Sequence, residues 1–325
     1  MKVFLTGGTG FVGGELARQL RARGDDVVAL ARSYEKAVAL GNLGCALVEG
    51  DLNAVDAIRS AVDGCDGVVH AAGVYAVGIP RSERPRVFEA NVRGTERVLD
   101  ASMEAGVPRI VHVSTIGVFG NTNGRVHPGR PTPERRDFLS VYDETKYLAH
   151  RLAEQRARDG APVTIAAPGA VYGPGDHSEI GEQLDRLQAG RLRFVAFPGT
   201  GFNALHVEDA AIGIILVLEG GAVGATYPLG GEITTLGDIL RTAASILGRS
   251  LPPRLPSALI KAGIPFGRLL GPLMGTPPNL REVVRAADGV TYWASDARAR
   301  EELDYAPRDL ETGLRQTLTA GPSGP

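Results

Sequence analysis

Short apolar runs alternate with segments of helical periodicity along the first half of the chain, and this alternation constrains the fold more than any other feature. Residues 54–62 and 91–106 have the spacing of helices. The runs around them are expected to be strands: 26–30, 46–50, 67–73, 109–114 and 163–168. Strand, helix and strand in succession predict parallel strands joined by crossover helices, and therefore an α/β fold with a doubly wound parallel sheet. Ligands of such sheets bind beyond the carboxyl ends of the strands.

A glycine-rich turn follows another expected strand at the start of the chain, in KVFLTGGTGFVGGELARQL (2–20). Gly7, Gly10 and Gly13 have no Cβ, so the turn can be tight, a ligand can approach the backbone, and the next helix can pack closely on its strand. The N-terminus of that helix offers unpaired N–H groups and a partial positive charge, which suit a pyrophosphate. Glycines also serve ordinary turns, so the turn alone leaves both interpretations open.

The regular alternation fades after about residue 172, where glycine and proline become frequent between shorter helical segments such as 206–219 and 234–248. A chain of 325 residues can hold one large domain or two smaller ones. We therefore expect the doubly wound domain to span residues 1–172. A smaller substrate-binding region is expected over residues 173–325, with some segments returning to the core of the first domain.

Charge and metal-ligand spacing restrict the partners. Lys and Arg number 35 against 37 Asp and Glu, which gives a formal net charge of -2 without a basic stripe. This balance favours a small-molecule partner over nucleic acid or an anionic membrane. Cys45 and Cys65 have neither metal-ligand spacing nor the pattern of a disulfide framework, which fits a reducing compartment. His112, His177 and His206 show no carboxylate–histidine spacing, so no metal is expected.

The N-terminus and the most apolar later stretch indicate where in the cell the protein is expected. The N-terminus enters its first strand without a charged leader or cleavage site, so a cytoplasmic protein is expected. The most apolar later stretch, residues 255–275, is interrupted by Lys261, Pro265 and Arg268, which disfavours a membrane-spanning helix. That stretch is expected either to cap a pocket or to belong to the core.

One tyrosine and one lysine have the spacing of a catalytic pair. Tyr142 and Lys146 lie four residues apart at the start of a helical pattern and so share one helix face. A free tyrosine has a pKa of about 10, and a neighbouring ammonium is expected to lower it. An accidental surface pair is the alternative, but only four lysines accompany 8 tyrosines, which makes a chance pair rare. Thr115 ends the strand RIVHVST, where its hydroxyl would face the same crevice.

Taken together, these residues resemble the extended short-chain dehydrogenases/reductases, the NAD(P)-dependent epimerase/dehydratase superfamily. The resemblance runs in order over about two thirds of the chain, and the final segment at 294–318 is similar as well. The motifs that carry it are TGGTGFVG (6–13), GDL (50–52), HAAG (70–73), NVRGT (91–95), HVSTIGVFG (112–120), YDETK (142–146), PGAVYGPGD (168–176) and HVEDA (206–210).

The resemblance implies that residues 1–172 form a dinucleotide-binding Rossmann domain, and it implies a role for each matching residue. Thr115, Tyr142 and Lys146 match the catalytic hydroxyl, the proton donor or acceptor, and the lysine that binds the nicotinamide ribose. Gly8, Gly10 and Gly13 would equally satisfy the G-x-G-x-x-G of other dehydrogenases. The implied cofactor contacts are Gly7, Thr9, Gly10, Phe11, Val12 and Gly13 in the turn, Asp51 and Leu52 beside the adenine, Ala71, Ala72 and Gly73 along the cofactor, Tyr142 and Lys146, and Pro168, Ala170 and Val171 near the nicotinamide. Members of the family often form homodimers, so a homodimer is expected.

The end of the second strand indicates which cofactor is used. NAD enzymes of this fold usually have a carboxylate there to hold the ribose hydroxyls, but this chain has Ala31 followed by Arg32. A carboxylate would repel a 2′-phosphate, whereas an arginine can bind one bidentately. NADP is therefore predicted, with Arg32 as the main contact and Lys36 as a second. The alternative is NAD, with Arg32 merely solvated.

Two departures from the family pattern favour a reductase. Sugar dehydratases of the family carry an Asp-Glu pair after the threonine, where this chain has Ile116 and Gly117. Nucleotide-sugar enzymes tend to carry an arginine shortly before the HV-x-D motif, where this chain has residues 202–204, Phe-Asn-Ala. The chain most resembles dihydroflavonol-reductase-like, 3β-hydroxysteroid-dehydrogenase-like and hopanoid-associated sugar epimerase-like members.

Three functions are consistent with these residues. The first is an NADP-dependent oxidoreductase acting on a ketone, an aldehyde or a secondary alcohol. Phe119, Tyr172 and Phe202, with residues 255–275, are expected to form its apolar substrate pocket. The second is an NAD(P)-dependent sugar epimerase that retains its cofactor and needs the same Tyr142 and Lys146. The third is a non-catalytic NADP-binding redox sensor, a class that typically loses both residues.

Overall fold

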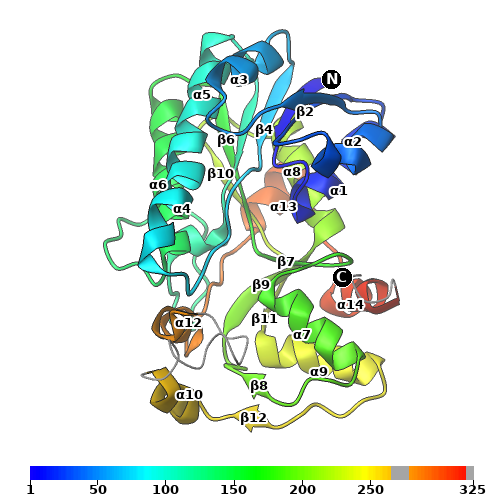
Figure 1. Cartoon of the computed structure of the whole chain (residues 1–325), viewed down its shortest axis with the longest axis vertical. Coiled ribbons are helices and arrows are strands. Elements are labelled where there is room, and N and C mark those ends of the chain that lie inside the picture. Colours follow the sequence, from blue (N-terminus) through cyan, green and yellow to red (C-terminus); the bar gives the residue numbers. More distant parts are fainter. Residues whose placement is uncertain (265–277, 320–325) are drawn as a thin grey trace.

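A seven-stranded parallel sheet forms the centre of the molecule in the computed structural model, which describes residues 1–264 and 278–319 (Figure 1). Every neighbouring pair of strands in this sheet is parallel. In spatial order the strands are β3 (Ala46–Glu49), β2 (Asp26–Ala31), β1 (Lys2–Thr6), β4 (Gly67–His70), β5 (Ile110–Val113), β6 (Val163–Pro168) and β10 (Thr226–Leu229). The predicted doubly wound α/β fold is confirmed, and the strand order reverses between β1 and β4, where such sheets bind ligands.

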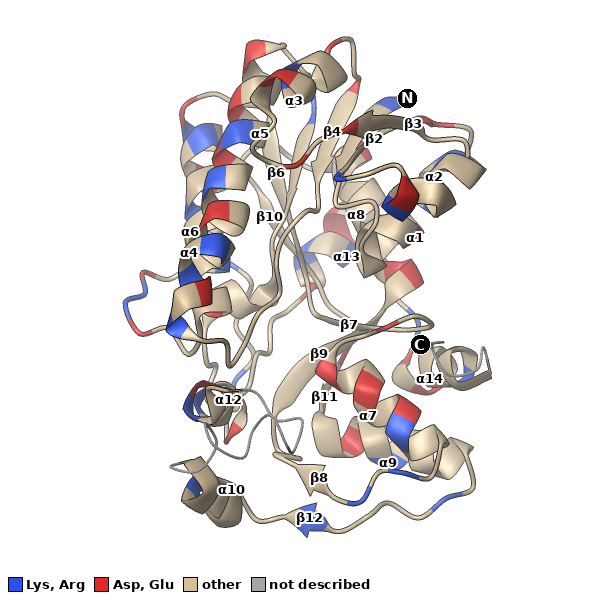
Figure 2. Ribbon diagram, in the orientation of Figure 1, with Lys and Arg blue, Asp and Glu red and all other residues tan. Residues whose placement is uncertain are grey.

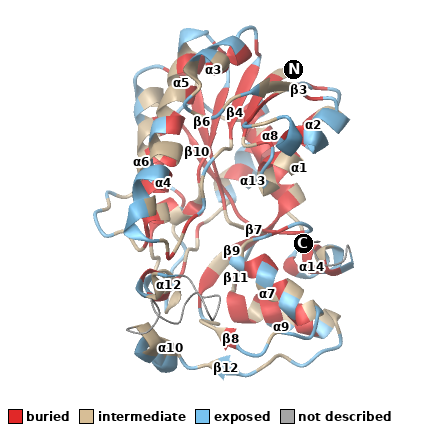
Figure 3. Cartoon of the chain, viewed as in Figure 1, coloured by how far each residue is buried: buried red, intermediate tan, exposed pale blue. Residues whose placement is uncertain are grey.

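Helices cover both faces of this sheet and bury its strands. One face packs against α1 (Phe11–Ala22), α2 (Val38–Asn42), α8 (Val207–Gly220) and α13 (Ala297–Leu303). The other face packs against α3 (Val55–Val62), α5 (Gly94–Glu104) and α6 (Val141–Arg158). All residues of β4, β5 and β6 are buried, as the continuous red of the central strands shows (Figure 3). Burial on both faces explains why these strands are mostly apolar in the sequence, with His70, His112 and Thr164 as buried polar exceptions.

A smaller unit lies at the carboxyl edge of the sheet, below it in Figure 1. It contains a three-stranded sheet of β11 (Glu232–Thr235), β9 (Gly201–His206) and β7 (Ala170–Tyr172), and a two-stranded sheet of β12 (Arg254–Leu255) and β8 (Val195–Ala196). The helices α7 (Glu179–Gln188), α9 (Leu236–Ile246) and α14 (Leu310–Thr319) pack on the larger of the two sheets. The predicted boundary after residue 172 coincides with the end of β7, and the chain later returns to the large sheet through α8, β10 and α13.

Short helices also occur in the connections within each unit. On the large unit these are η1 (Glu35–Ala37), η2 (Arg81–Glu83), α4 (Arg84–Phe88), the π-helix η3 (Glu89–Arg93) and η4 (Ile116–Phe119). On the small unit they are α10 (Ser257–Gly263) and α12 (Leu280–Ala287). Of the apolar stretch expected to cap a pocket, residues 255–264 form the end of β12 and α10, and residues 265–275 lie outside the described part of the chain.

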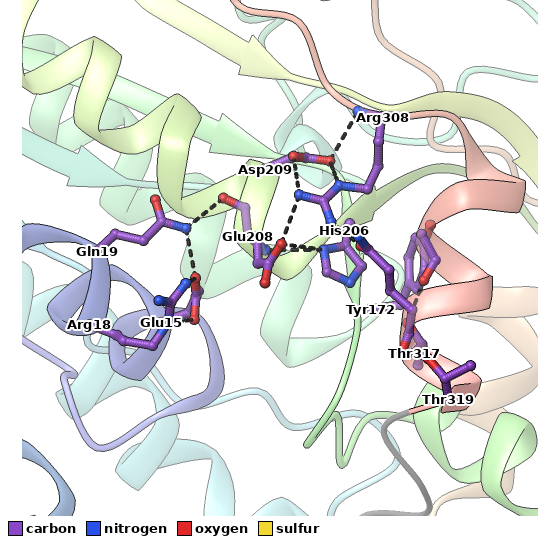
Figure 4. A network of polar contacts seen from close by, with 12 residues as sticks. Glu15, Arg18, Gln19, Tyr172, His206, Glu208, Asp209, Arg308, Thr317 and Thr319 are labelled. Atoms are coloured by element: carbon purple, nitrogen blue, oxygen red, sulfur yellow. Dashed lines mark hydrogen bonds and ion pairs between the residues drawn. The ribbon is translucent and has the colours of Figure 1, made fainter. Parts of the chain in front are cut away.

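A polar network joins the C-terminal segment to the large unit (Figure 4). The Arg308 guanidinium donates to both carboxylate oxygens of Asp209, at 2.8 and 2.9 Å. It also pairs with Glu208 at 2.9 Å, and the backbone carbonyl of Glu208 accepts a hydrogen bond from Gln19 Nε2 at 3.0 Å. The network therefore connects the segment before α14 through α8 to α1, the helix that follows the glycine-rich turn.

Positive and negative side chains are interspersed over the surface helices (Figure 2). No helix in the described ranges is both long and apolar enough to cross a bilayer.

Candidate active site

The glycine-rich turn after β1 is as tight as its sequence predicts. Gly7 has φ of +78°, and a Cβ on it would lie 2.6 Å from the backbone nitrogen of Ala72. A Cβ on Gly13 would lie 2.1 Å from the Gly7 carbonyl oxygen. Neither position can therefore hold a side chain. The loop after β4 occupies the space beside Gly7, and the close contact between α1 and the end of β1 occupies the space beside Gly13.

The N-terminus of α1 fits a phosphate group. Gly10 is its N-cap, and no side chain accepts a hydrogen bond from the first turn of the helix. That first turn, which includes Phe11 and Val12, contains no acidic residue. The free N–H groups and the helix dipole are therefore available to an anion beside Gly7, Thr9 and Gly10.

Arg32 and Lys36 lie at the same edge of the sheet as the glycine-rich turn. β1 and β2 pair in parallel with Thr6 opposite Leu30, so Arg32 follows its strand about where Gly7 follows the neighbouring one. Arg32 and Lys36 are both exposed, and the residue that ends β2 is a buried alanine, Ala31. The edge therefore presents cationic groups and no carboxylate at the strand end.

The other predicted cofactor residues lie on loops at this edge. Ala71 and Ala72 follow β4, and their N–H groups donate to the Thr6 carbonyl oxygen and Oγ1, both at 3.2 Å. Asp51 follows β3 and is exposed, and its carboxylate accepts a hydrogen bond from the Asn53 N–H at 2.8 Å. The remaining residues lie close by along the chain: Leu52 is half-buried against Gly94, Pro168 is buried at the end of β6, and Ala170 and Val171 are half-buried in β7.

Thr115 lies just past the carboxyl end of β5. Its backbone is extended, with φ of -158°, and it is the N-cap of η4. The Thr115 Oγ1 accepts a hydrogen bond from the Gly117 N–H at 3.2 Å, and the residue is only half-buried. Within residues 1–264 and 278–319 the hydroxyl proton has no acceptor, so it can donate to a ligand at this edge.

Tyr142 and Lys146 are on the first turns of α6, which begins at Val141. The helix is capped at Ser140, whose Oγ accepts a hydrogen bond from the Asp143 N–H at 3.1 Å. Lys146 is buried, and its Nζ donates to the Val113 carbonyl oxygen at the end of β5, at 2.8 Å. This hydrogen bond holds the lysine at the strand end that leads to Thr115.

Lys146 also lies close to the predicted cofactor loop. A Cβ placed on Gly73 would be 4.0 Å from Lys146 Nζ and 3.4 Å from Asn91 Oδ1. The structure therefore brings together the ends of β4 and β5 and the start of α6, where the sequence predicts catalytic and cofactor-binding residues.

Burial dominates the ionisation of this pair. Removal from water lowers the pKa of Lys146 to about 8. It raises the pKa of Tyr142 to about 12, with a smaller contribution from the negative charge of Asp143. The expectation that Lys146 lowers the pKa of Tyr142 is therefore wrong for the protein alone, because burial favours the neutral phenol and the lysine points to Val113. At neutral pH Tyr142 is a protonated hydroxyl, which can donate a proton.

Asn91 connects the cofactor loop to α6, a role that sequence reasoning did not assign. Its Oδ1 accepts from the Val74 N–H at 2.7 Å, and its Nδ2 donates to the Val74 carbonyl oxygen and to Thr145 Oγ1, both at 3.0 Å. Thr145 in turn donates to the carbonyl oxygen of Tyr142 at 3.2 Å. The NVRGT motif was the available signal, but a contact 54 residues apart is not visible in it.

Tyr75 is a second residue that the sequence did not single out. Its ring meets that of Tyr142 edge to face at a centroid distance of 4.8 Å, and the side chain is 58% exposed. Desolvation of its hydroxyl raises the pKa of Tyr75, and the negative charge of Glu179 raises it further, followed by Tyr142 and Tyr292. Tyr75 therefore lies against the ring of the proposed proton donor. Its position two residues after the HAAG motif was the signal that could have found it.

The predicted apolar pocket is only partly supported. Tyr172 is 1% exposed, its hydroxyl donates to the Leu310 carbonyl oxygen at 3.4 Å, and its ring lies in the core of the small unit. Phe119 is also buried, stacked on His127 at 4.4 Å. The prediction that these two side chains line the pocket is therefore wrong, because both complete local cores. Phe202 is half-buried and stacks with Tyr292 at 6.4 Å.

His70 and His112 are buried side by side in the large sheet. The two ring nitrogens of His70 are hydrogen-bonded to Thr6 Oγ1 at 2.7 Å and to Thr95 Oγ1 at 3.0 Å. The ring stacks on that of His112 at a centroid distance of 5.6 Å. Burial lowers the pKa of His70 to about 3 and places that of His112 well below its usual range. Within residues 1–264 and 278–319, no three His, Cys, Asp or Glu side chains are grouped as metal ligands.

The parallel sheet, the glycine-rich turn and the tyrosine–lysine pair define a dinucleotide-binding Rossmann enzyme, and comparison with known proteins supports this class. Residues 3–230 match the model of the NAD dependent epimerase/dehydratase family. The chain therefore belongs to this family of NAD(P)-dependent oxidoreductases and epimerases, as its motifs predicted.

Three similar proteins show the range of the family. The 4-hydroxy-2-methyl-3-oxo-4-farnesyl-3,4-dihydroquinoline-1-oxide ketoreductase of Stigmatella aurantiaca is 31% identical, over 100% of this chain and 98% of its own length. The 2-alkyl-3-oxoalkanoate reductase of Stenotrophomonas maltophilia is also 31% identical, over 97% of this chain and 98% of its own length. A Streptomyces venezuelae dTDP-glucose 4,6-dehydratase structure with bound NAD has the same fold, with a TM-score of 0.78 at 24% identity over 98% of this chain and 96% of its own.

Proposed function

We propose that the protein is an NADP-dependent oxidoreductase. It reduces the ketone or aldehyde group of a small apolar substrate and also oxidises the corresponding secondary alcohol. The observation that carries the proposal is the position of the half-buried Tyr142 and the buried Lys146 on the first turns of α6, at the carboxyl edge of the sheet, with the tyrosine protonated at neutral pH. Two relatives that align over almost their whole length, the ketoreductase and the 2-alkyl-3-oxoalkanoate reductase, support this direction of reaction.

The residues suggest how each part of the site acts. NADPH, when bound, supplies the hydride that the carbonyl carbon accepts. The Tyr142 O–H donates its proton to the carbonyl oxygen, and the free Thr115 hydroxyl donates a hydrogen bond to the same oxygen. Lys146, which is cationic below its pKa of about 8, would bind the nicotinamide ribose beside the carboxyl end of β5. In the alcohol-oxidising direction Tyr142 acts as the base.

The proposed cofactor contacts lie at the carboxyl edge of the large sheet, where the residues fit a dinucleotide. Gly7, Gly10 and Gly13 leave room for a pyrophosphate beside the free N–H groups of α1. The remaining contacts proposed are those at the ends of β3, β4 and β6 and on α6: Asp51, Leu52, Ala71, Ala72, Gly73, Tyr142, Lys146, Pro168, Ala170 and Val171.

The preference for NADP over NAD is proposed from Arg32, with Lys36 as a second contact. In Arg32→Ser, NADPH binding should weaken about 10- to 100-fold, because a charge-assisted bidentate contact to the 2′-phosphate is lost. NADH binding should stay within about 2-fold, because NADH has no such phosphate. Fluorescence titration of both nucleotides measures the difference, and Arg136→Lys, at another exposed arginine, is the control. Equal losses for both nucleotides would contradict the role of Arg32.

The catalytic role of Tyr142 is tested by turnover. The purified protein is assayed with NADPH and a panel of apolar ketones comprising α-tetralone, acetophenone and cyclohexanone. In Tyr142→Phe the proton donor is missing, so kcat should fall at least about 100-fold while NADPH affinity stays nearly unchanged. A variant that retains full turnover would remove Tyr142 from the mechanism.

An epimerase that retains its cofactor is the second candidate. The match to the NAD dependent epimerase/dehydratase family model favours it, and an epimerase would need the same Tyr142 and Lys146. The position of Ile116 and Gly117 after Thr115 speaks against a dehydratase, because neither side chain transfers protons. Tightly retained NAD in the purified protein would favour the epimerase, and exchangeable NADPH the reductase. The third candidate, a non-catalytic sensor, predicts nucleotide binding without turnover.

A further inference from the structure

A buried ion pair lies next to the proposed catalytic residues and has no part in the mechanism above. The two terminal nitrogens of Arg135 donate to the two carboxylate oxygens of Asp143, at 2.7 and 2.6 Å. Their side chains are 6% and 7% exposed. Among the ion pairs within residues 1–264 and 278–319, this is the one in which both side chains are less than a tenth exposed. Desolvating two charges is costly, and a buried pair is therefore weak evidence for stability alone.

The guanidinium also contacts the segment that carries Thr115. Arg135 Nη1 donates to the carbonyl oxygen of Gly117 at 3.2 Å and, less closely, to that of Val118 at 3.4 Å. Both residues belong to η4, which begins directly after Thr115, and the Gly117 N–H donates to Thr115 Oγ1. The position of η4 thus sets the position of the Thr115 hydroxyl.

The carboxylate contacts the segment that carries Tyr142. Asp143 is the next residue on α6, and its Oδ2 accepts a second hydrogen bond from the Leu139 N–H at 3.0 Å. Its own N–H donates to the helix cap, Ser140. The ion pair therefore joins η4 and the first turn of α6, the two segments from which the proposed reacting hydroxyls extend.

Neighbouring residues confine the Arg135 guanidinium on several sides. Gly120 has φ of +81°, and a Cβ on it would lie 2.8 Å from Arg135 Nε. The rings of Phe138 and Tyr147 cover the guanidinium at 5.1 and 5.9 Å from their centroids. The Tyr147 hydroxyl also accepts a hydrogen bond from the backbone N–H of Arg135 at 3.2 Å. A planar group with several directed donors fills this slot, whereas an ammonium could not make all of these contacts.

We propose that Arg135 is a positioning residue, which through Asp143 and the carbonyls of η4 fixes the distance between the hydroxyls of Thr115 and Tyr142. The proposal rests on the proposed function, since it assumes that both hydroxyls hydrogen-bond one substrate oxygen. A misplacement of about 1 Å of such groups can lower the rate about 100-fold.

The test compares Arg135→Lys with wild type, using α-tetralone and NADPH. The lysine keeps the charge opposite Asp143 but loses the fork, so kcat should fall about 10- to 100-fold. The KM for α-tetralone should change less than about 3-fold, because the two hydroxyls act most strongly on the charge that develops on the oxygen in the transition state. The Kd for NADPH should also change less than about 3-fold, because the proposed phosphate contacts lie on the glycine-rich turn. Arg136→Lys, at the exposed neighbouring arginine, is the matched control and should leave kcat unchanged.

A double variant separates positioning from charge balance. Arg135→Gln with Asp143→Asn leaves no unpaired charge in the slot, so it should fold, but it lacks the contacts to η4. We expect its kcat to stay as low as that of Arg135→Lys. Wild-type kcat in either variant would overturn the proposal, even where Tyr142→Phe confirms the proposed function.

Hydrogen exchange provides a readout that needs no substrate. In Arg135→Lys, amide exchange at residues 117–120 and 141–146 should accelerate together, because both segments lose their shared contact. If wild type reduces none of the ketones, the proposed function fails and the exchange result alone decides the positioning role. Unchanged exchange in both segments would overturn that role.

Discussion

Lys146 shows how burial rather than sequence sets the chemistry of a single residue. Its pKa falls from 10.5 to about 8 because its ammonium is removed from water, where it donates a hydrogen bond to the Val113 carbonyl oxygen. Between these two pKa values the folded protein binds fewer protons than the unfolded chain, so the free energy of unfolding rises with pH through this window. Below pH 8 the buried charge costs about 3 kcal/mol.

Replacing Lys146 by Met tests this cost. At pH 7 the variant should be more stable than wild type by up to about 3 kcal/mol, and the difference should shrink as the pH approaches 10.5. Urea unfolding of both proteins at pH 7 and pH 10 measures the change. Lys36→Met, at an exposed lysine, is the control. A stability difference that does not vary with pH would contradict the lowered pKa.

The sequence predicted Tyr142 and Lys146 as a pair but not their ionisation or their neighbours. Spacing placed them on one helix face, whereas the pKa of Tyr142 depends on burial by segments remote in the chain. Tyr75, Asn91 and Arg135 were missed for a related reason. Their relevant contacts reach 67, 54 and 18 residues along the chain and follow no local period.

At the scale of elements, the sequence predicted best where the pattern is local. β1, β4 and β5 are mostly apolar because they are buried on both faces, and all were expected as strands. β10 was not identified individually, because Thr226–Leu229 is four residues long and includes a proline. Its place beside β6 follows from α8 crossing the sheet, a long-range packing that periodicity does not encode.

The smaller unit was the least predictable element group. Its sheet pairs β9 with β11 across about 30 residues in antiparallel register, and β7 with β9 in parallel register. Tyr172 looked like a pocket residue in the PGAVYGPGD motif but fills the core between this sheet and α14. An aromatic residue near a motif carries no information on which way its side chain points.

At the scale of the whole molecule, Arg308 joins the C-terminal segment to the sheet unit. Asp209 is 5% exposed and accepts from the Arg308 guanidinium and from its backbone N–H, the latter at 3.0 Å. The same guanidinium pairs with Glu208, whose carbonyl oxygen is bound by Gln19 of α1 (Figure 4). One arginine thus connects the segment before α14 to α8 and, through it, to the helix of the glycine-rich turn.

Asp209→Ala should therefore loosen the C-terminal segment and lower stability. Removing one partner of a largely buried, hydrogen-bonded ion pair costs about 2 to 3 kcal/mol, because the Arg308 guanidinium keeps only Glu208 as a carboxylate partner. For a chain of this length the loss corresponds to a Tm lower by about 3 to 5 °C in differential scanning calorimetry. Glu311→Gln removes an exposed ion pair with Arg315 on α14 and should change the Tm by less than about 1 °C. Equal Tm values for Asp209→Ala and wild type would show that the C-terminal segment is held by the apolar contacts of α14 alone.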